Sequence, residues 1–337
     1  MNHVSLGRSG LQVSELVLGT NAFGSRFGDG ADRSESGRIL DAYLTAGGNH
    51  VDACGASDAG ASDAFLGLLL AEAGARDRVI LAAGGGTAPF RPAGPVSQRR
   101  QLVQSVERSL MRLCTDYLDL LWVSPAEFMA PIEEVMHTLD SLVRQGKVLY
   151  LGLADTPAWV LAQANTLASA NGWTPFTAAR TEYSLFENRA DEELFPAVRM
   201  FGMSIVARAS GGWGLPPAPK GEAADLESAG APGRPVHPKW VRDDAIRRAV
   251  SEVARVTGSS QAQVALNWAR AKGVMPVLEP ARCAELASAV AGLRKTLASP
   301  HVAQLDAAAR TRAEPPGSLD AQSCILDGGT LPLRAAK

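Results

Sequence analysis

The stretch Tyr117-Leu118-Asp119-Leu120-Leu121-Trp122-Val123 is an almost continuous apolar run. A helical pattern follows it at 132–145, and a second apolar run follows at 149–153. Short runs of this kind are typical of strands that are buried on both faces. A strand, a helix and a second strand in this order predict a right-handed βαβ unit in a parallel sheet.

The same alternation continues in both directions along the chain. We expect strands at 16–19, 50–52, 79–83, 117–123, 149–153, 176–179, 204–207 and 275–278, and helices at 34–46, 61–73, 96–113, 132–145, 158–170, 192–201, 243–256, 260–272 and 283–293. About eight such units, without a Gly-x-Gly-x-x-Gly loop after a strand, favour a closed (β/α)8 barrel, the TIM barrel, over a doubly wound sheet. We therefore predict one barrel domain over residues 1–337.

Two segments break this rhythm because they are rich in Gly, Pro and small residues. Residues 210–238 form an expected long loop after the seventh strand, which is either a lid over the barrel mouth or a plain linker. Residues 314–337 form an expected C-terminal tail.

The charge balance limits the partners of this chain. It has 33 Lys and Arg against 35 Asp and Glu, a net charge of −2, whereas nucleic acid and anionic membranes require a basic face. No apolar run reaches the ~18 residues of a membrane span, and the N-terminus has no signal-peptide pattern. The four cysteines form no CxxC pair and the five histidines no metal-ligand spacing. We expect a cytoplasmic protein that acts on a small molecule without a metal, in an oligomeric state that the sequence leaves open.

Five motifs occur in one order along the chain: LGRSGLQVS (6–14), SLMRLCTDYLDL (109–120), GKVLYLG (146–152), EYSL (182–185) and QVALNW (263–268). With them the sequence resembles the aldo-keto reductases over nearly its whole length. The resemblance implies an N-terminal β-hairpin in front of the barrel. Because these motifs are mostly scaffold motifs, they imply the fold more directly than the reaction.

The resemblance also implies a catalytic set of Tyr, Lys, Asp and His at strand ends, most of which is replaced here. Asp52 matches the Asp. Ser57 stands at the Tyr position, Gly84 at the Lys position and Ser124 at the His position. A serine hydroxyl is a far weaker acid than the phenol of tyrosine, whose pKa is ~10. Asp52, Ser57, Ser124 and the neighbouring Asp58 are thus the candidate catalytic residues.

The implied NADP(H) site is changed as well. Asp155 lies in place of the amide that would hold the nicotinamide, and Arg180 replaces a Gln. Arg208 stands where an aromatic ring would stack on the nicotinamide. Arg282 alone keeps its family identity, as a contact to the adenosine phosphate. We therefore expect no cofactor, with NADP(H) as the alternative.

The new charges have two interpretations. Asp155, Arg180 and Arg208 either form a patch that binds a carboxylate or phenolate of the substrate, or they neutralise one another. Asp52 either forms a relic ion pair with one of these arginines or acts on substrate. Tyr183, Trp122 and Trp213 are expected to line the substrate cavity, with packing in the core as the alternative.

Three functions follow from these replacements. The first is a redox-independent enzyme, such as a cyclase, isomerase, dehydratase or lyase, acting on an organic metabolite of bacterial specialised metabolism. The second is an NADP-dependent oxidoreductase with a substitute proton donor, Asp58 or Tyr183. The third is a non-catalytic binding protein. Because charges replace the lost residues, and a buried charge costs stability, we favour the first.

Overall fold

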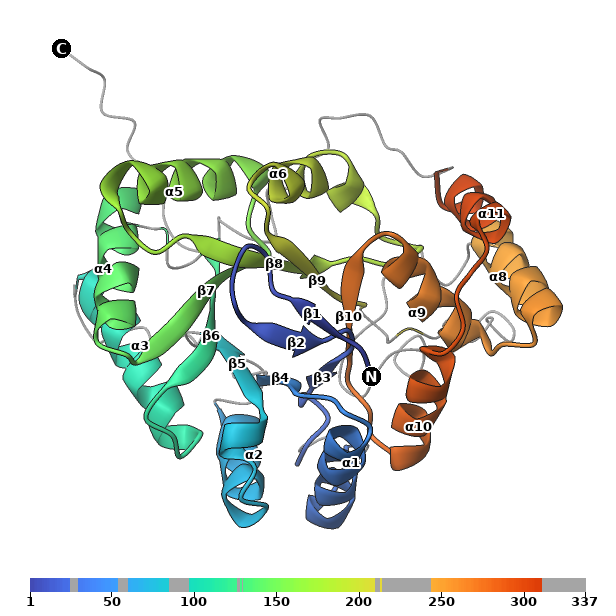
Figure 1. Ribbon diagram of the computed structural model, residues 1–337, viewed down its shortest axis with the longest axis horizontal. Helices are drawn as coiled ribbons and strands as arrows, with labels where there is room; N and C mark the ends of the chain where they lie inside the picture. Colours follow the sequence, from blue (N-terminus) through green and yellow to red (C-terminus); the bar gives the residue numbers. More distant parts are fainter. Residues whose placement is uncertain are drawn as a thin grey trace, which may run out of the picture.

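The computed structural model contains a closed barrel of eight parallel strands (Figure 1). It describes residues 1–24, 30–53, 60–84, 97–125, 128, 130–209, 213 and 244–310. Around the barrel the strands follow the order β10-β3-β4-β5-β6-β7-β8-β9, and helices form an outer layer. The predicted (β/α)8 barrel is therefore confirmed. The 210–238 loop, apart from Trp213, and the 314–337 tail lie outside the described residues.

The elements begin and end close to the positions expected from the sequence. The strands are β1 (His3–Ser5), β2 (Gln12–Ser14), β3 (Val17–Gly19), β4 (His50–Ala53), β5 (Ile80–Gly84), β6 (Leu118–Val123), β7 (Val148–Ala154), β8 (Phe176–Glu182), β9 (Ser204–Arg208) and β10 (Val274–Leu278). The helices are α1 (Arg33–Thr45), α2 (Ala61–Glu72), α3 (Gln98–Arg112), α4 (Ile132–Arg144), α5 (Ala158–Asn171), α6 (Leu194–Met200), α8 (Asp244–Thr257), α9 (Gln261–Ala271), α10 (Cys283–Gly292) and α11 (Ser299–Arg310). The expected list of helices lacked α11, which packs against α8 and α9.

Side chains alternate between the barrel interior and the helix layer along each strand, as strand geometry requires. The interior apolar cluster takes one parity from each barrel strand except β4: Val17, Ala82, Leu120, Trp122, Ala154, Ala178, Val206, Met275 and Val277. The opposite parity packs against the helices. This alternation decides which residues at the strand ends face the barrel mouth.

The β1–β2 hairpin closes the end of the barrel opposite the mouth. Its two strands pair antiparallel, with Val4 opposite Val13. Leu6 and Val13 are fully buried in the interior cluster, and the hairpin lies across the barrel in Figure 1. The Gly7 N–H donates to Ser204 Oγ at 2.7 Å, which ties the hairpin to β9. The opposite end, at the carboxyl ends of the strands, is therefore the candidate location of a site.

Helix signals in the sequence account for the outer layer. At the start of α9, Ser260 Oγ accepts from the Gln263 N–H at 3.2 Å and Gln263 Oε1 accepts from the Ser260 N–H at 3.1 Å, a complete capping box. Ser97 caps α3 and Asp32 caps α1, each through one side-chain oxygen that accepts from a backbone N–H of the first turn. Of the helices that the structure describes, none has the length and apolar character needed to cross a membrane.

Gly152 makes room for the largest side chain inside the barrel. A Cβ on Gly152 would lie 2.4 Å from Cζ3 of Trp122, an approach that real side chains do not make. The indole of Trp122 is therefore able to lie flat against β7 only because residue 152 has no side chain.

We predict that Gly152→Ala lowers the free energy of unfolding by about 1–3 kcal/mol, because the added methyl overpacks the barrel interior. Chemical denaturation with circular dichroism measures the change. Gly10→Ala is the matched control, since a Cβ on Gly10 meets nothing within 4 Å. Equal stability of the two variants would show that Trp122 moves freely.

His50, the first residue of β4, is fully buried and shares the interior parity of Asp52. Among the residues that the structure describes, neither of its ring nitrogens has a hydrogen-bond partner. Burial lowers the pKa of His50 from 6.5 to about 4, so the folded protein holds this ring neutral at pH 7.

A histidine with a lowered folded pKa destabilises the fold as the pH falls, because the unfolded chain takes up the proton first. We predict that His50→Leu loses less stability than the wild type between pH 6.5 and 4, by up to about 3 kcal/mol. Denaturation midpoints across this range measure the difference. His3→Gln, at an exposed position, should follow the wild type. A parallel pH profile for His50→Leu would contradict the neutral buried ring.

Candidate active site

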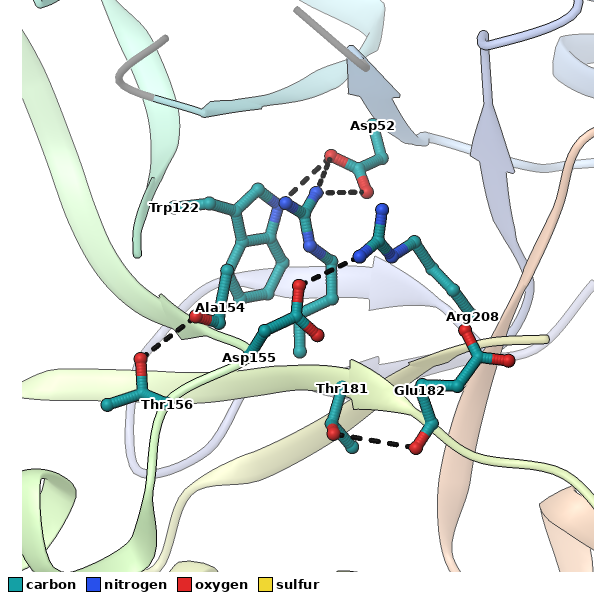
Figure 2. Close-up of polar contacts among 9 residues, drawn as sticks. Asp52, Trp122, Ala154, Asp155, Thr156, Thr181, Glu182 and Arg208 are labelled. Carbon is teal, nitrogen blue, oxygen red and sulfur yellow. Dashed lines mark hydrogen bonds and ion pairs between the residues drawn. The ribbon is translucent and has the colours of Figure 1, made fainter. Parts of the chain in front are cut away.

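The barrel mouth brings together four charged side chains and a tryptophan from five strands of the closed sheet (Figure 2). Asp52 lies on β4, Trp122 on β6 and Arg180 on β8, while Arg208 ends β9 and Asp155 follows β7. In (β/α)8 barrels, side chains at the carboxyl ends of the strands build the active site. The predicted charged set is therefore assembled in one place, although its members are far apart in sequence.

A buried ion pair forms the floor of this mouth. Arg180 Nη1 donates to both carboxylate oxygens of Asp52, at 3.0 and 2.8 Å, and Trp122 Nε1 donates to Oδ1 at 3.0 Å. The side chains of Asp52 and Arg180 are only 4% and 11% exposed. The guanidinium also lies 5.0 Å from the centre of the Trp122 ring, within cation–π range. Arg180 therefore supplies the cation that Asp52 was expected to require.

A second, more exposed ion pair lies beside the first. Arg208 Nη2 donates to Asp155 Oδ2 at 2.8 Å, with side-chain exposures of 15% for the arginine and 41% for the aspartate. Asp155 has a left-handed backbone, with φ of 49°, and its N–H donates to the Arg180 carbonyl at 2.8 Å. Aspartate tolerates this conformation better than most residues, although it still costs free energy. Arg208 thus pairs with Asp155, whereas Arg180 pairs with Asp52.

Tyr183 does not belong to this set. Its ring stacks on Trp268 of α9 with centroids 5.1 Å apart, and its hydroxyl donates to Asp191 at 3.0 Å. The side chain is fully buried in the helix layer, and burial and the Asp191 carboxylate raise its pKa well above the ordinary value. The prediction that Tyr183 lines the substrate cavity or replaces the proton donor is therefore corrected, because Tyr183 has the outward parity of β8.

The two tryptophans are both buried, as the core alternative expected. Trp122 is 1% exposed, inside the barrel beneath Arg180. Trp213 Nε1 donates to the carbonyl of Val277 on β10 at 2.7 Å, and this residue too is almost fully buried. Trp122 thus contacts the mouth residues Asp52 and Arg180, and the Trp213 side chain is hydrogen-bonded to β10.

The serine and acid candidates are placed only in part. Ser124 is half-buried and directly follows β6, at the mouth. Ser57 and Asp58 lie outside the residues that the structure describes. Ala53, the residue after Asp52, is the last residue of β4, so Ser57 and Asp58 follow this strand in the sequence.

Two glutamates at the mouth are absent from the expected site. Glu182 has the inward parity of Arg180 and is the register partner of Arg208, beside which it lies in Figure 2. Glu279 follows β10 with the parity of Val277, and its Cγ would lie 2.7 Å from a Cβ on Gly19. Side chains that face the barrel interior recur at every second residue of a strand. Once one inward residue of β8 and one of β10 are known, this spacing identifies both glutamates.

The start of α10 carries the predicted phosphate contact, Arg282. This exposed residue is the N-cap of the helix. Two backbone N–H groups around it are already bound by carboxylates: Cys283 donates to Glu35 Oε1 at 2.7 Å, and Ala281 donates to Glu285 Oε2 at 2.9 Å. Glu35 comes from α1, so this contact also joins the first and last parts of the barrel.

We predict that Arg180→Met lowers the free energy of unfolding by about 3–5 kcal/mol, because it leaves the buried Asp52 carboxylate without its cation. Arg208→Met is the matched control. Its partner Asp155 is substantially exposed, so the loss should stay below about 1 kcal/mol. Urea denaturation of the two variants measures the difference, and equal losses would contradict the distinction between a buried and an exposed pair.

Comparison with known proteins gives the reaction class of the relatives. The Aldo/keto reductase family profile matches residues 15–310. The norsolorinic acid reductase of Aspergillus flavus is 29% identical over 312 residues, covering 88% of this chain and 78% of the relative. The norsolorinic acid reductase stcV of Emericella nidulans is 32% identical over 285 residues, 80% of this chain and 71% of the relative. The aryl-alcohol dehydrogenase [NADP(+)] of Phanerodontia chrysosporium is 35% identical over 210 residues, 58% of this chain and 54% of the relative.

These relatives correct the function expected first. All three are named as reductases or dehydrogenases, which contradicts a redox-independent enzyme and agrees with the oxidoreductase alternative. The expectation gave too much weight to the replaced residues and too little to the scaffold that surrounds them. By the match across most of its length, the chain belongs to the aldo/keto reductase family.

Proposed function

We propose that this chain is an oxidoreductase that interconverts a carbonyl group and an alcohol on a small aromatic molecule, with a nicotinamide dinucleotide as the redox partner. The observation that carries the proposal is the Asp52–Arg180–Trp122 network at the barrel mouth. Burying an ion pair costs several kcal/mol of desolvation, so a new pair at this position supports a rebuilt polar site over a decayed one. The aromatic substrate class rests on the printed names of the relatives.

The exposed ion pair fits the nicotinamide end of such a cofactor. A primary carboxamide has one acceptor oxygen and two N–H donors. Arg208 offers N–H donors and Asp155 offers acceptor oxygens, side by side at the mouth. We propose that these two residues hold the carboxamide in place of the amide and hydroxyl groups that the family resemblance implies. When bound, the cofactor supplies or accepts the hydride.

The substrate oxygen requires a proton donor in the direction of reduction. Asp52 is held by N–H donors from Arg180 and Trp122 and therefore serves as an acceptor, while Tyr183 faces the helix layer. We propose Asp58, in its neutral carboxylic acid form, as the donor, because it follows Asp52 closely in the chain and a neutral carboxylic acid is a stronger acid than the Ser57 hydroxyl. Ser124 and Arg180 are the proposed hydrogen-bond donors that orient the carbonyl.

We predict that the purified protein oxidises a reduced nicotinamide cofactor in the presence of an aryl aldehyde such as benzaldehyde. Asp58→Asn should lower kcat by about 100-fold or more, because it removes the acid, while the cofactor Kd stays unchanged. Stopped-flow absorbance of the reduced nicotinamide measures turnover. Asp77→Asn, at an exposed position outside the mouth, is the control and should keep full activity. Unchanged kcat in Asp58→Asn would refute the donor assignment.

A further inference from the structure

We propose that the start of α10 excludes the 2′-phosphate of NADP(H), so that this chain selects NAD(H). The proposal rests on the proposed oxidoreductase function and adds the identity of the cofactor. NADP(H) is the cofactor that the family resemblance implies, and the residues around Arg282 do not fit its additional phosphate.

The family resemblance implies the location, because it places the adenosine phosphate of the cofactor at Arg282, and the barrel geometry agrees with it. α10 begins directly after β10, which closes the barrel between β9 and β3. The loops after the last strands of (β/α)8 barrels, together with a helix N-terminus, commonly bind phosphate, since free N–H groups and the helix dipole attract an anion. A phosphate group near Arg282 would require those N–H groups to be available.

In this chain, two side-chain carboxylates already accept hydrogen bonds from backbone N–H groups at the start of α10. Glu35 Oε1 accepts from the Cys283 N–H at 2.7 Å, and Glu285 Oε2 accepts from the Ala281 N–H at 2.9 Å. The Glu35 side chain is only 18% exposed, and its second oxygen pairs with Arg38. Both oxygens of Glu35 thus have partners. The anion at the start of α10 is therefore a side chain of the protein itself.

The pKa of the neighbouring Cys283 thiol is shifted by burial and by the same negative charge. Burial and the Glu35 carboxylate raise the pKa of the Cys283 thiol, because a thiolate there would be partly desolvated and would face a like charge. A phosphate dianion at this position would meet the same repulsion. Arg282 offers one cation, and Arg38 is already engaged by Glu35.

These carboxylates, which repel a 2′-phosphate, favour a cofactor with a free 2′-hydroxyl, such as NAD(H). A ribose hydroxyl is a hydrogen-bond donor, and carboxylates that accept from ribose hydroxyls are the usual mark of NAD selection in dinucleotide sites. Glu35 and Glu285 are the carboxylates at the start of α10, and because each carboxylate oxygen has two lone pairs, both residues can accept a ribose hydroxyl in addition to their present donors. They therefore act as specificity-determining residues.

The test is the Kd of NADH and of NADPH, measured separately by nicotinamide fluorescence with the wild-type protein and with Glu35→Gln. We expect NADH to bind the wild type at least about tenfold more tightly than NADPH. Glu35→Gln keeps an acceptor for the Cys283 N–H but removes the charge, so NADPH should bind at least about tenfold more tightly while NADH changes little. Glu72→Gln, on an exposed position of α2, is the control for removing one negative charge.

The outcomes separate this inference from the proposed function. Tighter binding of NADPH than NADH by the wild type would overturn the inference and leave the oxidoreductase function intact. An unchanged NADPH affinity in Glu35→Gln would also overturn it. Absence of binding for both cofactors at millimolar concentration would overturn the proposed function and the inference together.

Discussion

The ion pair between Asp52 and Arg180 is the interaction on which the barrel mouth depends. It spans the barrel interior from β4 to β8, and Trp122 from β6 completes it. The pair and Trp122 are joined by hydrogen bonds, the Trp122 indole lies against Gly152, and Arg180 Nε has no hydrogen-bond partner among the described residues. The scaffold of the aldo/keto reductase family surrounds this charged floor.

The sequence predicted the barrel well because each of its signals is local. Apolar runs mark strands, amphipathic stretches mark helices, and their alternation specifies a parallel closed sheet without knowledge of distant contacts. The helix α11 was missed because it lies after the last barrel unit, where no further strand was expected to require a helix. The site was predicted less completely. Two arginines were possible partners of Asp52 from the sequence, and only the three-dimensional structure distinguishes Arg180, 128 positions away, from Arg208.

Strand parity explains the main errors in the site. Arg180 and Tyr183 are three residues apart, so if one faces the barrel interior the other faces the helices. The two were nevertheless assigned to one pocket because both occupy family motif positions. Glu279 was missed for a related reason: β10 is apolar on both faces, so hydropathy does not reveal that Val277 is the inward residue. Contacts such as Glu35 with Cys283, 248 positions apart, have no local signal at all.

Transfer of a hydride between cofactor and substrate tests the account most directly. The protein would be incubated with an aryl aldehyde and NADH that carries deuterium at both C4 positions of the nicotinamide, and the products analysed by mass spectrometry. The account predicts an aryl alcohol that carries one deuterium on its carbinol carbon. Recovery of unchanged aldehyde from protein that is saturated with the cofactor, or of a product without deuterium, would contradict it.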